Sequence, residues 1–205
     1  MKKISKEKKY IKSFYDKNAQ SWVSFKTNSF YHEKPFRLFE KLLKKDSTVL
    51  DIGCAGGIHL PLFLGIGDKL KYEGIDVSKK MIEIARARYP RNKFHVSGIE
   101  DFNSNKKFDA FWAAAILMHF NKNEITSVFK NMHSITKNKA IGYLTLPNKR
   151  PNEESLTDKR LFSIYTKKEI SEILKNIGWS ILYSGKNPDP RPGFAWSWYI
   201  VQKIK

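Results

Sequence analysis

Residues 49–57 read Val49-Leu50-Asp51-Ile52-Gly53-Cys54-Ala55-Gly56-Gly57. Residues 48–52 are rich in residues that favour β-strands and predict a short strand, and the small residues behind them predict a tight turn. Small side chains let the backbone approach a ligand, and a helix expected after the turn offers N–H groups without intrahelical partners. This stretch therefore predicts a ligand site at the end of a strand.

The rest of the chain alternates between strand-like and helix-like patterns. Further strands are expected over residues 72–76, 93–96, 108–114, 140–146, 179–183 and 196–201. Helices are expected over residues 57–64, 78–87, from 121 onward and 167–177, and a proline-containing loop over 185–193. Such alternation, closed by a final pair of strands, predicts an α/β fold. We expect an open sheet of about seven strands, mostly parallel with an antiparallel closing strand, and helices on both faces.

Capping residues support three of these helices. Ser78 can cap the helix that contains Met81 and Ile82. Asn121 is followed three residues later by Glu124, and Thr166 is followed three residues later by Glu169, which is the spacing of a capping box. Gly178 is placed to end the last helix.

The N-terminal part has a weaker pattern. Residues 1–20 predict a short amphipathic helix behind a frayed end, residues 34–43 predict a second helix, and residues 22–25 predict a loop or short helix. We expect one domain over residues 1–205. Within it, residues 1–45 form a helical lid or cap and residues 46–205 form an α/β core.

Composition limits the classes of function. The chain has 205 residues, with 38 Lys and Arg against 20 Asp and Glu, a net charge of +18. A field of that size favours anionic partners, including nucleic acid. The single cysteine, Cys54, excludes an internal disulfide and fits a reducing cytoplasm, and the five histidines lack metal-ligand spacing. The start lacks the apolar core of a secretory signal, and the longest apolar run, 110–118, is too short to span a bilayer.

The turn after the first strand also discriminates between ligands. A dinucleotide fingerprint requires glycines in the pattern G-x-G-x-x-G, but Ala55 and Ile58 occupy its second and third positions when counted from Gly53. Asp51, two residues before that glycine, would repel a pyrophosphate and suits a ligand with an ammonium group. These residues disfavour a nicotinamide-dependent dehydrogenase and favour S-adenosylmethionine, which carries an ammonium and a sulfonium and no phosphate.

Residues 49–57, read together with the later strand ends, resemble the first motif of the class I S-adenosylmethionine-dependent methyltransferases. The resemblance covers about residues 40–203, and its clearest departure is Ala55, where glycine is usual. It implies a Rossmann-like sheet, S-adenosylmethionine as the cofactor and S-adenosylhomocysteine as the product.

The resemblance also implies where the cofactor binds. Asp76 ends the second strand and would bind the ribose hydroxyls, and residues 97–102 would bracket the adenine, although Gly98 stands where the family usually has an acid. Glu100 and Asp101 are the two candidates to supply that acid instead. The cofactor-binding residues implied in this way are Asp51, Gly53, Cys54, Ala55, Gly57, Asp76, Val77, Met81, Gly98, Ile99, Glu100, Ala113 and Ala114.

His119 is the titratable residue that the resemblance brings nearest to the reacting atoms. It is the candidate base for the acceptor proton, and a packing role in the loop after the fourth strand is the alternative. The acceptor pocket should be roofed by segments outside the shared sheet. Its candidate residues are Tyr15, Trp22, Phe25, Tyr31, His32, Arg160, Phe162 and Tyr165. Trp196 and Trp198 are expected to pack within the closing strand, and Cys54 to fill the turn rather than act as a nucleophile.

Three functions remain open from the sequence. The first is a methyltransferase acting on a small molecule by direct displacement. The second is an RNA methyltransferase with tRNA as its expected substrate, which the charge of +18 favours. The third is a cofactor-binding partner protein without catalysis, which the departures at Ala55 and Gly98 suggest. Neither the acceptor nor the oligomeric state follows from the sequence.

Overall fold

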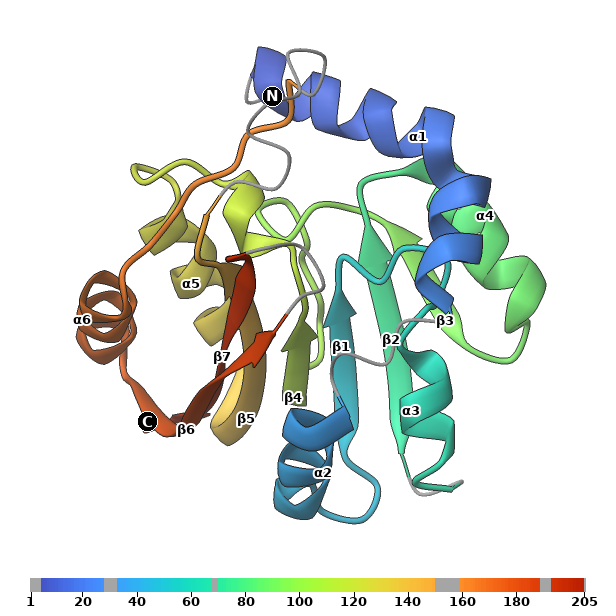
Figure 1. Cartoon of the computed structure of the whole chain (residues 1–205). Coiled ribbons are helices and arrows are strands. Elements are labelled where there is room, and N and C mark those ends of the chain that lie inside the picture. Colours follow the sequence, from blue (N-terminus) through green and yellow to red (C-terminus); the bar gives the residue numbers. More distant parts are fainter. Residues whose placement is uncertain (1–4, 28–32, 68–69, 150–158, 189–192, 205) are drawn as a thin grey trace.

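The computed structural model describes residues 5–27, 33–67, 70–149, 159–188 and 193–204. Its described residues form a seven-stranded sheet in the order β3-β2-β1-β4-β5-β7-β6 (Figure 1). The strands are β1 (Thr48–Ile52), β2 (Lys71–Asp76), β3 (Lys93–Val96), β4 (Phe108–Ala113), β5 (Thr136–Pro147), β6 (Trp179–Pro188) and β7 (Ala195–Lys203).

The strand directions confirm the predicted sheet. β1 pairs in parallel with β2 and β4, while β2 pairs in parallel with β3 and β4 with β5. β7 runs antiparallel to both of its neighbours, β5 and β6. Two lengths were predicted wrongly. β5 begins at Thr136, earlier than expected. β6 continues to Pro188 through residues expected to be a loop, because each of those residues pairs with a residue of β7.

Helices cover both faces of the sheet. They are α1 (Lys6–Thr27), α2 (Glu33–Leu42), α3 (Leu60–Leu64), α4 (Lys79–Arg88), the short 3-10 helix η1 (Leu117–His119), α5 (Ile125–Ser134) and α6 (Lys167–Ile177). One face packs against α5 and α6, and the other against α2, α3 and α4. α1 crosses above the carboxyl ends of the central strands (Figure 1).

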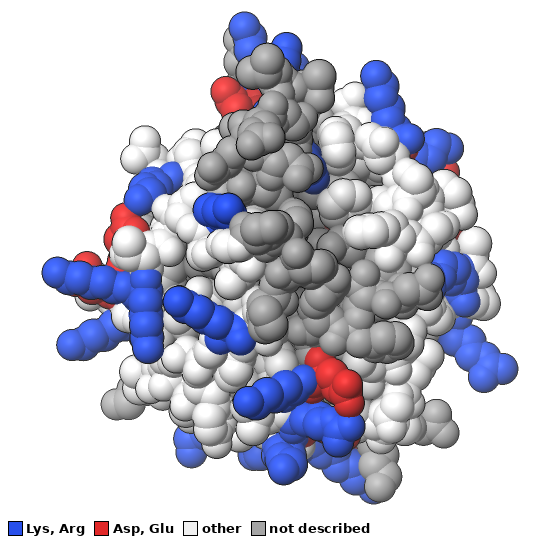
Figure 2. Space-filling view, viewed as in Figure 1, with Lys and Arg blue, Asp and Glu red and all other residues white. Residues whose placement is uncertain are grey.

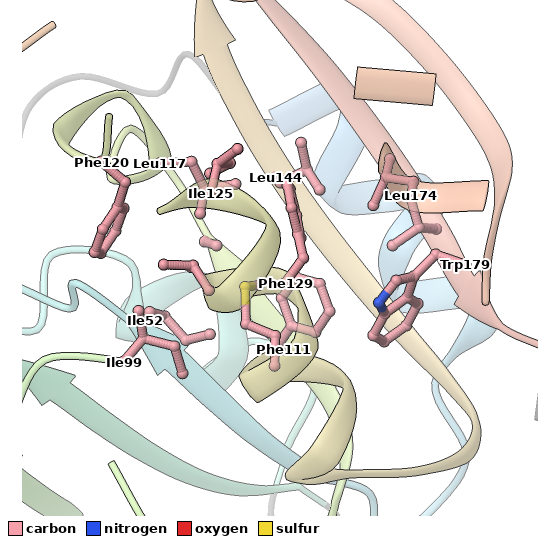
Figure 3. Packing of buried hydrophobic residues seen from close by; sticks show 14 of the residues in the cluster. Ile52, Ile99, Phe111, Leu117, Phe120, Ile125, Phe129, Leu144, Leu174 and Trp179 are labelled. Atoms are coloured by element: carbon pink, nitrogen blue, oxygen red, sulfur yellow. The ribbon is translucent and has the colours of Figure 1, made fainter. Parts of the chain in front are cut away.

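The first core cluster lies between the sheet and helices α5 and α6. Phe111 of β4 meets the Trp179 ring edge-on at 5.4 Å, and Phe129 of α5 is fully buried beside them (Figure 3). Leu144 of β5 and Leu174 of α6 extend the same cluster. It therefore joins the parallel half of the sheet to the closing strands.

The second core cluster covers the opposite face and is centred on Trp112. The indole of this residue stacks on Tyr143 with ring centroids 3.7 Å apart. Its edges meet the rings of Phe36, Phe39 and Phe63 at 5.2 to 5.7 Å. Trp112 thus links β4 and β5 to α2 and α3.

The N-terminal helix is longer than predicted. α1 reaches Thr27 and includes residues 22–25, which were expected to be a loop or short helix. Asp16 anchors it, because its Oδ1 accepts hydrogen bonds from Ser78 Oγ (2.6 Å) and Lys80 N (3.2 Å) at the start of α4. α2 packs into the second core cluster rather than over the strand ends. The division into a lid over residues 1–45 and a core over residues 46–205 stays a prediction.

The predicted caps form local hydrogen bonds. Ser78 Oγ accepts from Met81 N, and Thr166 with Glu169 forms a complete capping box. Gly178 ends α6 in the left-handed conformation at φ 100°. Asn121 Oδ1 accepts from Glu124 N (3.0 Å), but this bond belongs to a turn, and α5 begins only at Ile125.

The capping box of α6 gives a stability prediction. Thr166→Ala removes the acceptor of the Glu169 backbone N–H (3.1 Å) and is expected to lower the free energy of unfolding by about 1 kcal/mol. Guanidinium unfolding followed by circular dichroism measures the change. Thr166→Ser keeps the acceptor and should remain close to the wild type, whereas equal losses in both variants would contradict the capping role.

Basic side chains are spread over the visible described part of one face of the molecule. Figure 2 shows Lys and Arg around the rim of one face, without a single dominant patch on its visible described part. Within the described residues, no helix is both long and apolar enough to cross a bilayer.

Candidate functional site

A cavity of about 490 Å³ lies at the carboxyl ends of the parallel strands. The turns after β1, β2, β3 and β4 form its floor, and α1 supplies much of its roof. The residues after β1 and β2 that line it include Gly53, Ala55, Asp76, Val77 and Met81. The sequence-predicted residues Gly98, Ile99, Glu100 and Ala114 line it as well.

The glycine turn is held against β2. The N–H groups of Gly53 and Cys54 both donate to the Ile75 carbonyl, at 2.8 and 3.0 Å. Gly53 has φ +75°, and a Cβ there would lie 2.7 Å from Ile116 Cδ1. A larger residue would be strained and would also collide with the loop after β4. The turn thus keeps its backbone exposed to the cavity.

Ala55 adopts the conformation that the family's usual glycine would favour. Its φ is +48°, and its methyl group packs with Ala19 and Val23 of α1 and with Met81. Its N–H donates to Asp76 Oδ2 at 3.0 Å. The alanine is therefore accommodated by contacts with α1 and does not block the cavity.

Asp76 lies where β2 ends, on the cavity wall. Besides the bond from Ala55, its Oδ1 accepts from Ser78 N at 2.8 Å. Burial raises the pKa of this carboxyl to about 6, although both backbone hydrogen bonds oppose the shift. The group is thus a fixed acceptor that ionises close to neutral pH.

Asp51 differs from its predicted position. It is fully buried below the turn and does not line the cavity. Its Oδ2 accepts from the Tyr72 hydroxyl (2.6 Å) and lies 3.6 Å from His59 Nδ1. Successive strand residues point to opposite faces, so Asp51 faces the second core cluster while Ile52 belongs to the first. Its Oδ1 has no hydrogen-bond partner among the described residues.

Three other residues that were predicted to bind the cofactor lie behind the cavity wall and do not line the cavity. Cys54 is buried beside Gly74, where an added Cβ would be 2.7 Å from its sulfur. Burial raises the pKa of the Cys54 thiol, which keeps it protonated and agrees with its predicted role of filling the turn. Gly57 packs against the Tyr89 ring, and Ala113 belongs to the first core cluster.

The position of the Glu100 carboxylate accounts for the glycine at position 98. A Cβ on Gly98 would lie 2.6 Å from Glu100 Oε2, so the carboxylate folds over the backbone where a side chain of residue 98 would begin. Glu100 Oε2 is buried without a hydrogen-bond partner among the described residues. The other carboxylate oxygen pairs with Lys8 of α1 at 3.1 Å.

Lys8 links α1 to two loops through ion pairs. Its ammonium also pairs with Glu124 at 3.1 Å. Burial alone would lower the pKa of Lys8, but the hydrogen bonds to Glu124 and Glu100 outweigh it and raise the pKa. Lys8 and Asp16 therefore hold α1 over the cavity at two points.

His119, Tyr15 and Arg160 form a hydrogen-bonded cluster on the wall. His119 Nδ1 donates to the Leu161 carbonyl at 2.8 Å, which leaves Nε2 as the acceptor in the neutral ring. The Tyr15 hydroxyl lies 2.9 Å from that Nε2 and accepts from Arg160 Nη1 at 3.1 Å. The structure thus joins three sequence-predicted residues from separate parts of the chain.

The other acceptor-site predictions have different outcomes. Trp22, Phe25 and Phe162 line the cavity. Tyr165 does not, because its ring lies in the first core cluster and its hydroxyl donates to the Phe120 carbonyl (3.1 Å). Burial raises the pKa of Tyr165 to about 12. Tyr31 and His32 lie outside the described residues.

Some wall residues were missed by the sequence reasoning. Trp196 lines the cavity, although packing within β7 was expected for it, whereas Trp198 is buried in the second core cluster as expected. The other missed residues are Lys8, Ile11, Ile52, Ile58, His59, Ile75, Ala115, Ile116, Met118 and Phe120. Ala115 and Ile116 closely follow the end of β4, a signal that could have indicated them. Within the part of the chain that the structure describes, no three His, Cys, Asp or Glu residues are grouped to hold a metal ion.

Together these features define a doubly wound α/β domain with a ligand cavity at its strand ends. Residues 49–139 match the family described as "Methyltransferase domain". Over 109 residues the chain is 32% identical to the ubiquinone biosynthesis O-methyltransferase of Pelagibacter ubique, an alignment that covers 51% of this chain and 44% of that relative. Over residues 49–139 the chain is thus similar to methyltransferase domains, and it spans less than half the length of this relative.

Solved structures share the whole fold. The 1,6-didemethyltoxoflavin-N1-methyltransferase of Burkholderia thailandensis, with bound 1,6-didemethyltoxoflavin and S-adenosylhomocysteine, superposes with a TM-score of 0.78 at 15% identity. That match covers 100% of this chain and 93% of the other. The [4+2]-cyclase SpnF gives a TM-score of 0.71 at 16% identity, covering 94% and 95% of the two chains. Because a cyclase shares it, the fold alone does not define the reaction.

Proposed function

We propose that this protein transfers a methyl group from S-adenosylmethionine to a small-molecule acceptor by direct displacement. The observation that carries the proposal is the joint position of Asp76 and the Gly53–Ala55 turn on one cavity wall, linked by the Ala55 N–H. A carboxylate can accept hydrogen bonds from two vicinal hydroxyls, which suits the ribose of the cofactor. Val77 and Met81 supply apolar surface beside it.

The charges of this wall fit a cationic ligand. Asp76 lies on the wall, and Asp51 lies below the turn with an oxygen that lacks a partner among the described residues. Two carboxylates next to one turn favour an ammonium or sulfonium group over a pyrophosphate. We therefore propose that Asp51 does not contact the cofactor directly, and that its negative charge attracts the cationic groups of the cofactor across the turn.

Glu100 is the proposed replacement for the acid expected at position 98. Its carboxylate already fills the space above Gly98, and its buried Oε2 can accept a hydrogen bond from an amino group. The neighbouring Ile99 and Gly98 line the same part of the cavity. We place the adenine there, with Ala114 closing the side towards β4.

The cofactor supplies a methyl group on a sulfonium, so the protein must align the acceptor, exclude water and remove a proton where one is lost. α1 and its aromatic residues Trp22 and Phe25 would exclude water. Tyr15 and His119 form the proposed proton-accepting pair, because His119 Nε2 accepts a hydrogen bond from the Tyr15 hydroxyl. A proton leaving the acceptor passes to the Tyr15 oxygen as the hydroxyl proton of Tyr15 moves to Nε2.

This pair gives a kinetic prediction. Tyr15→Phe and His119→Gln are each expected to lower kcat by about 100-fold, because each interrupts the same proton path. The dissociation constant of S-adenosylhomocysteine should stay within about threefold of the wild type, since neither change removes the proposed ribose or adenine contacts. Single-turnover kinetics with calorimetric binding separates the two effects. Equal losses in binding and kcat would contradict a proton-transfer role.

The acceptor class is tested by methyl-labelled S-adenosylmethionine. The protein would be incubated with pooled small metabolites and, separately, with total tRNA at two salt concentrations. A cavity of about 490 Å³ suits a small acceptor, so we expect label in the small-molecule fraction. The charge of +18 supports RNA as the second candidate. Label found only in tRNA, with a steep loss at high salt, would favour that candidate.

A further inference from the structure

The turn that carries Glu100 is held by backbone hydrogen bonds. Phe102 N donates to the Gly98 carbonyl at 2.9 Å, and the side-chain amide of Asn131 donates to the Ile99 carbonyl. The Glu100 side chain itself is 24% exposed, so its carboxylate could turn towards water. The turn therefore fixes where this side chain begins, but not the direction of its carboxylate.

Lys8 of α1 holds that carboxylate in place. Its ammonium lies 3.1 Å from Glu100 Oε1, and among the described residues no other cation pairs with Glu100. The same ammonium lies 3.1 Å from Glu124 Oε1 and 5.5 Å from the centroid of the Phe120 ring. With Oε1 engaged by Lys8, Oε2 is the Glu100 oxygen that lacks a partner among the described residues. It is therefore the oxygen that can accept a hydrogen bond from a ligand.

The two ion pairs of Lys8 have different positions relative to the cavity. Lys8 and Glu100 are among the residues that line it, whereas Glu124 is not. The pair with Glu124 docks α1 at the turn before α5, and the pair with Glu100 orients an acceptor in the cavity wall. Lys8 also lies outside residues 49–139, the part of the chain that is similar to methyltransferase domains. A polar group of the wall thus depends on a residue of the N-terminal helix.

We infer that Lys8 is a positioning residue, which orients Glu100 so that the cavity selects a purine with an amino group at C6 over one with an oxygen there. A carboxylate accepts the hydrogen bond that an amino group donates, but a C6 oxygen is itself an acceptor. A site built to pair with a donor rejects an analogue that lacks it, because the acceptor of the site is then left unpaired. The inference rests on the proposed function and adds the residue that sets the choice of base.

Calorimetric binding of S-adenosylhomocysteine and S-inosylhomocysteine measures this preference, because the second ligand has an oxygen at C6. The wild type is expected to bind the 6-amino ligand at least about 10-fold more tightly. Lys8→Met is expected to weaken S-adenosylhomocysteine by about 10-fold and to leave S-inosylhomocysteine within about threefold, because the released Glu100 carboxylate can turn away from the base. Lys8→Arg keeps a cation at this position and should retain most of the preference.

Two control variants separate the orientation of Glu100 from the docking of α1. Glu124→Gln removes the charge that forms the other ion pair of Lys8, and Lys9→Met removes an exposed lysine of the same helix. Both should keep the wild-type preference for the 6-amino ligand. Glu100→Gln should lose that preference, and adding Lys8→Met to it should change the preference by less than about twofold, since Lys8 acts through Glu100.

Circular dichroism checks that each variant is folded, and Lys8→Gln replaces Lys8→Met if the latter is not. The inference is overturned if the Lys8 variant weakens both ligands equally, which would leave Lys8 only the docking of α1. It is also overturned if the wild type binds both ligands with the same affinity, although the proposed function would then stand. A wild type that binds neither ligand would instead refute the proposed function.

Discussion

Asp76→Ala is expected to weaken the binding of S-adenosylhomocysteine by at least about 100-fold. The proposed carboxylate accepts hydrogen bonds from two ribose hydroxyls, and each charge-assisted bond contributes about 1.5–3 kcal/mol. The substitution also removes the acceptor for the N–H groups of Ala55 and Ser78, which loosens the glycine turn. Isothermal titration calorimetry measures the loss. Asp101→Ala is the matched control, because Asp101 is an exposed acid near the same loop.

The pH dependence of binding gives an independent check on Asp76. Its pKa of about 6 means that, below that pH, protons would compete with the ribose hydroxyls proposed to bind there. Wild-type affinity should be level above pH 7 and fall below pH 6, by at most about tenfold per pH unit. Asp76→Asn should bind weakly and lose this dependence between pH 5 and 7. A variant that keeps the wild-type profile would assign the titration to another group.

Trp112→Ala is expected to lower the free energy of unfolding by about 3–5 kcal/mol. The indole is fully buried, and its removal opens a space between Tyr143, Phe36, Phe39 and Phe63. Rings held on separate helices and strands cannot all move in to fill that space. Guanidinium unfolding at 25 °C measures the change.

Phe25→Ala is the control for removing a large aromatic side chain. Phe25 is 69% exposed, so its loss should change the free energy of unfolding by less than about 0.5 kcal/mol. The role of the second core cluster in linking α2 and α3 to the sheet would be contradicted if Trp112→Ala lowered the free energy of unfolding no more than Phe25→Ala does.

The fold was predictable because its signals are local. The β-rich run at residues 48–52, the largely apolar run at residues 108–114, the Ser78 cap and the Thr166 capping box each depend on neighbours within a few residues. Element lengths were less predictable, because they depend on distant partners. β6 continues to Pro188 only because β7 lies beside it, and α1 continues past Trp22 because its residues pack on Ala55 and Met81.

The location of the site at the strand ends was predictable from the sequence. Which side chains line the cavity was less predictable. Strand position identifies Asp76 and the Gly53 turn, but the direction of a side chain decides whether it faces the cavity. Asp51 faces the core for that reason, and Tyr165 does so because its loop folds inward. The contact between Tyr15 and His119 spans 104 residues, so no local pattern could indicate it.

The two departures from the family pattern do not require a protein without activity. Ala55 adopts the left-handed conformation and packs on α1, and Glu100 occupies the space that Gly98 leaves open. Each departure thus has a compensating contact on the same wall. A cofactor-binding partner protein remains distinguishable from an enzyme by whether bound S-adenosylmethionine is consumed.

The most direct measurement is calorimetric titration of the wild-type protein with S-adenosylmethionine and, separately, with S-adenosylhomocysteine. We predict one binding site per chain for each ligand, with a dissociation constant in the micromolar range and competition between the two. Absence of binding by both ligands at millimolar concentration, with the protein folded, would contradict the central claim that this cavity is a methyltransferase cofactor site.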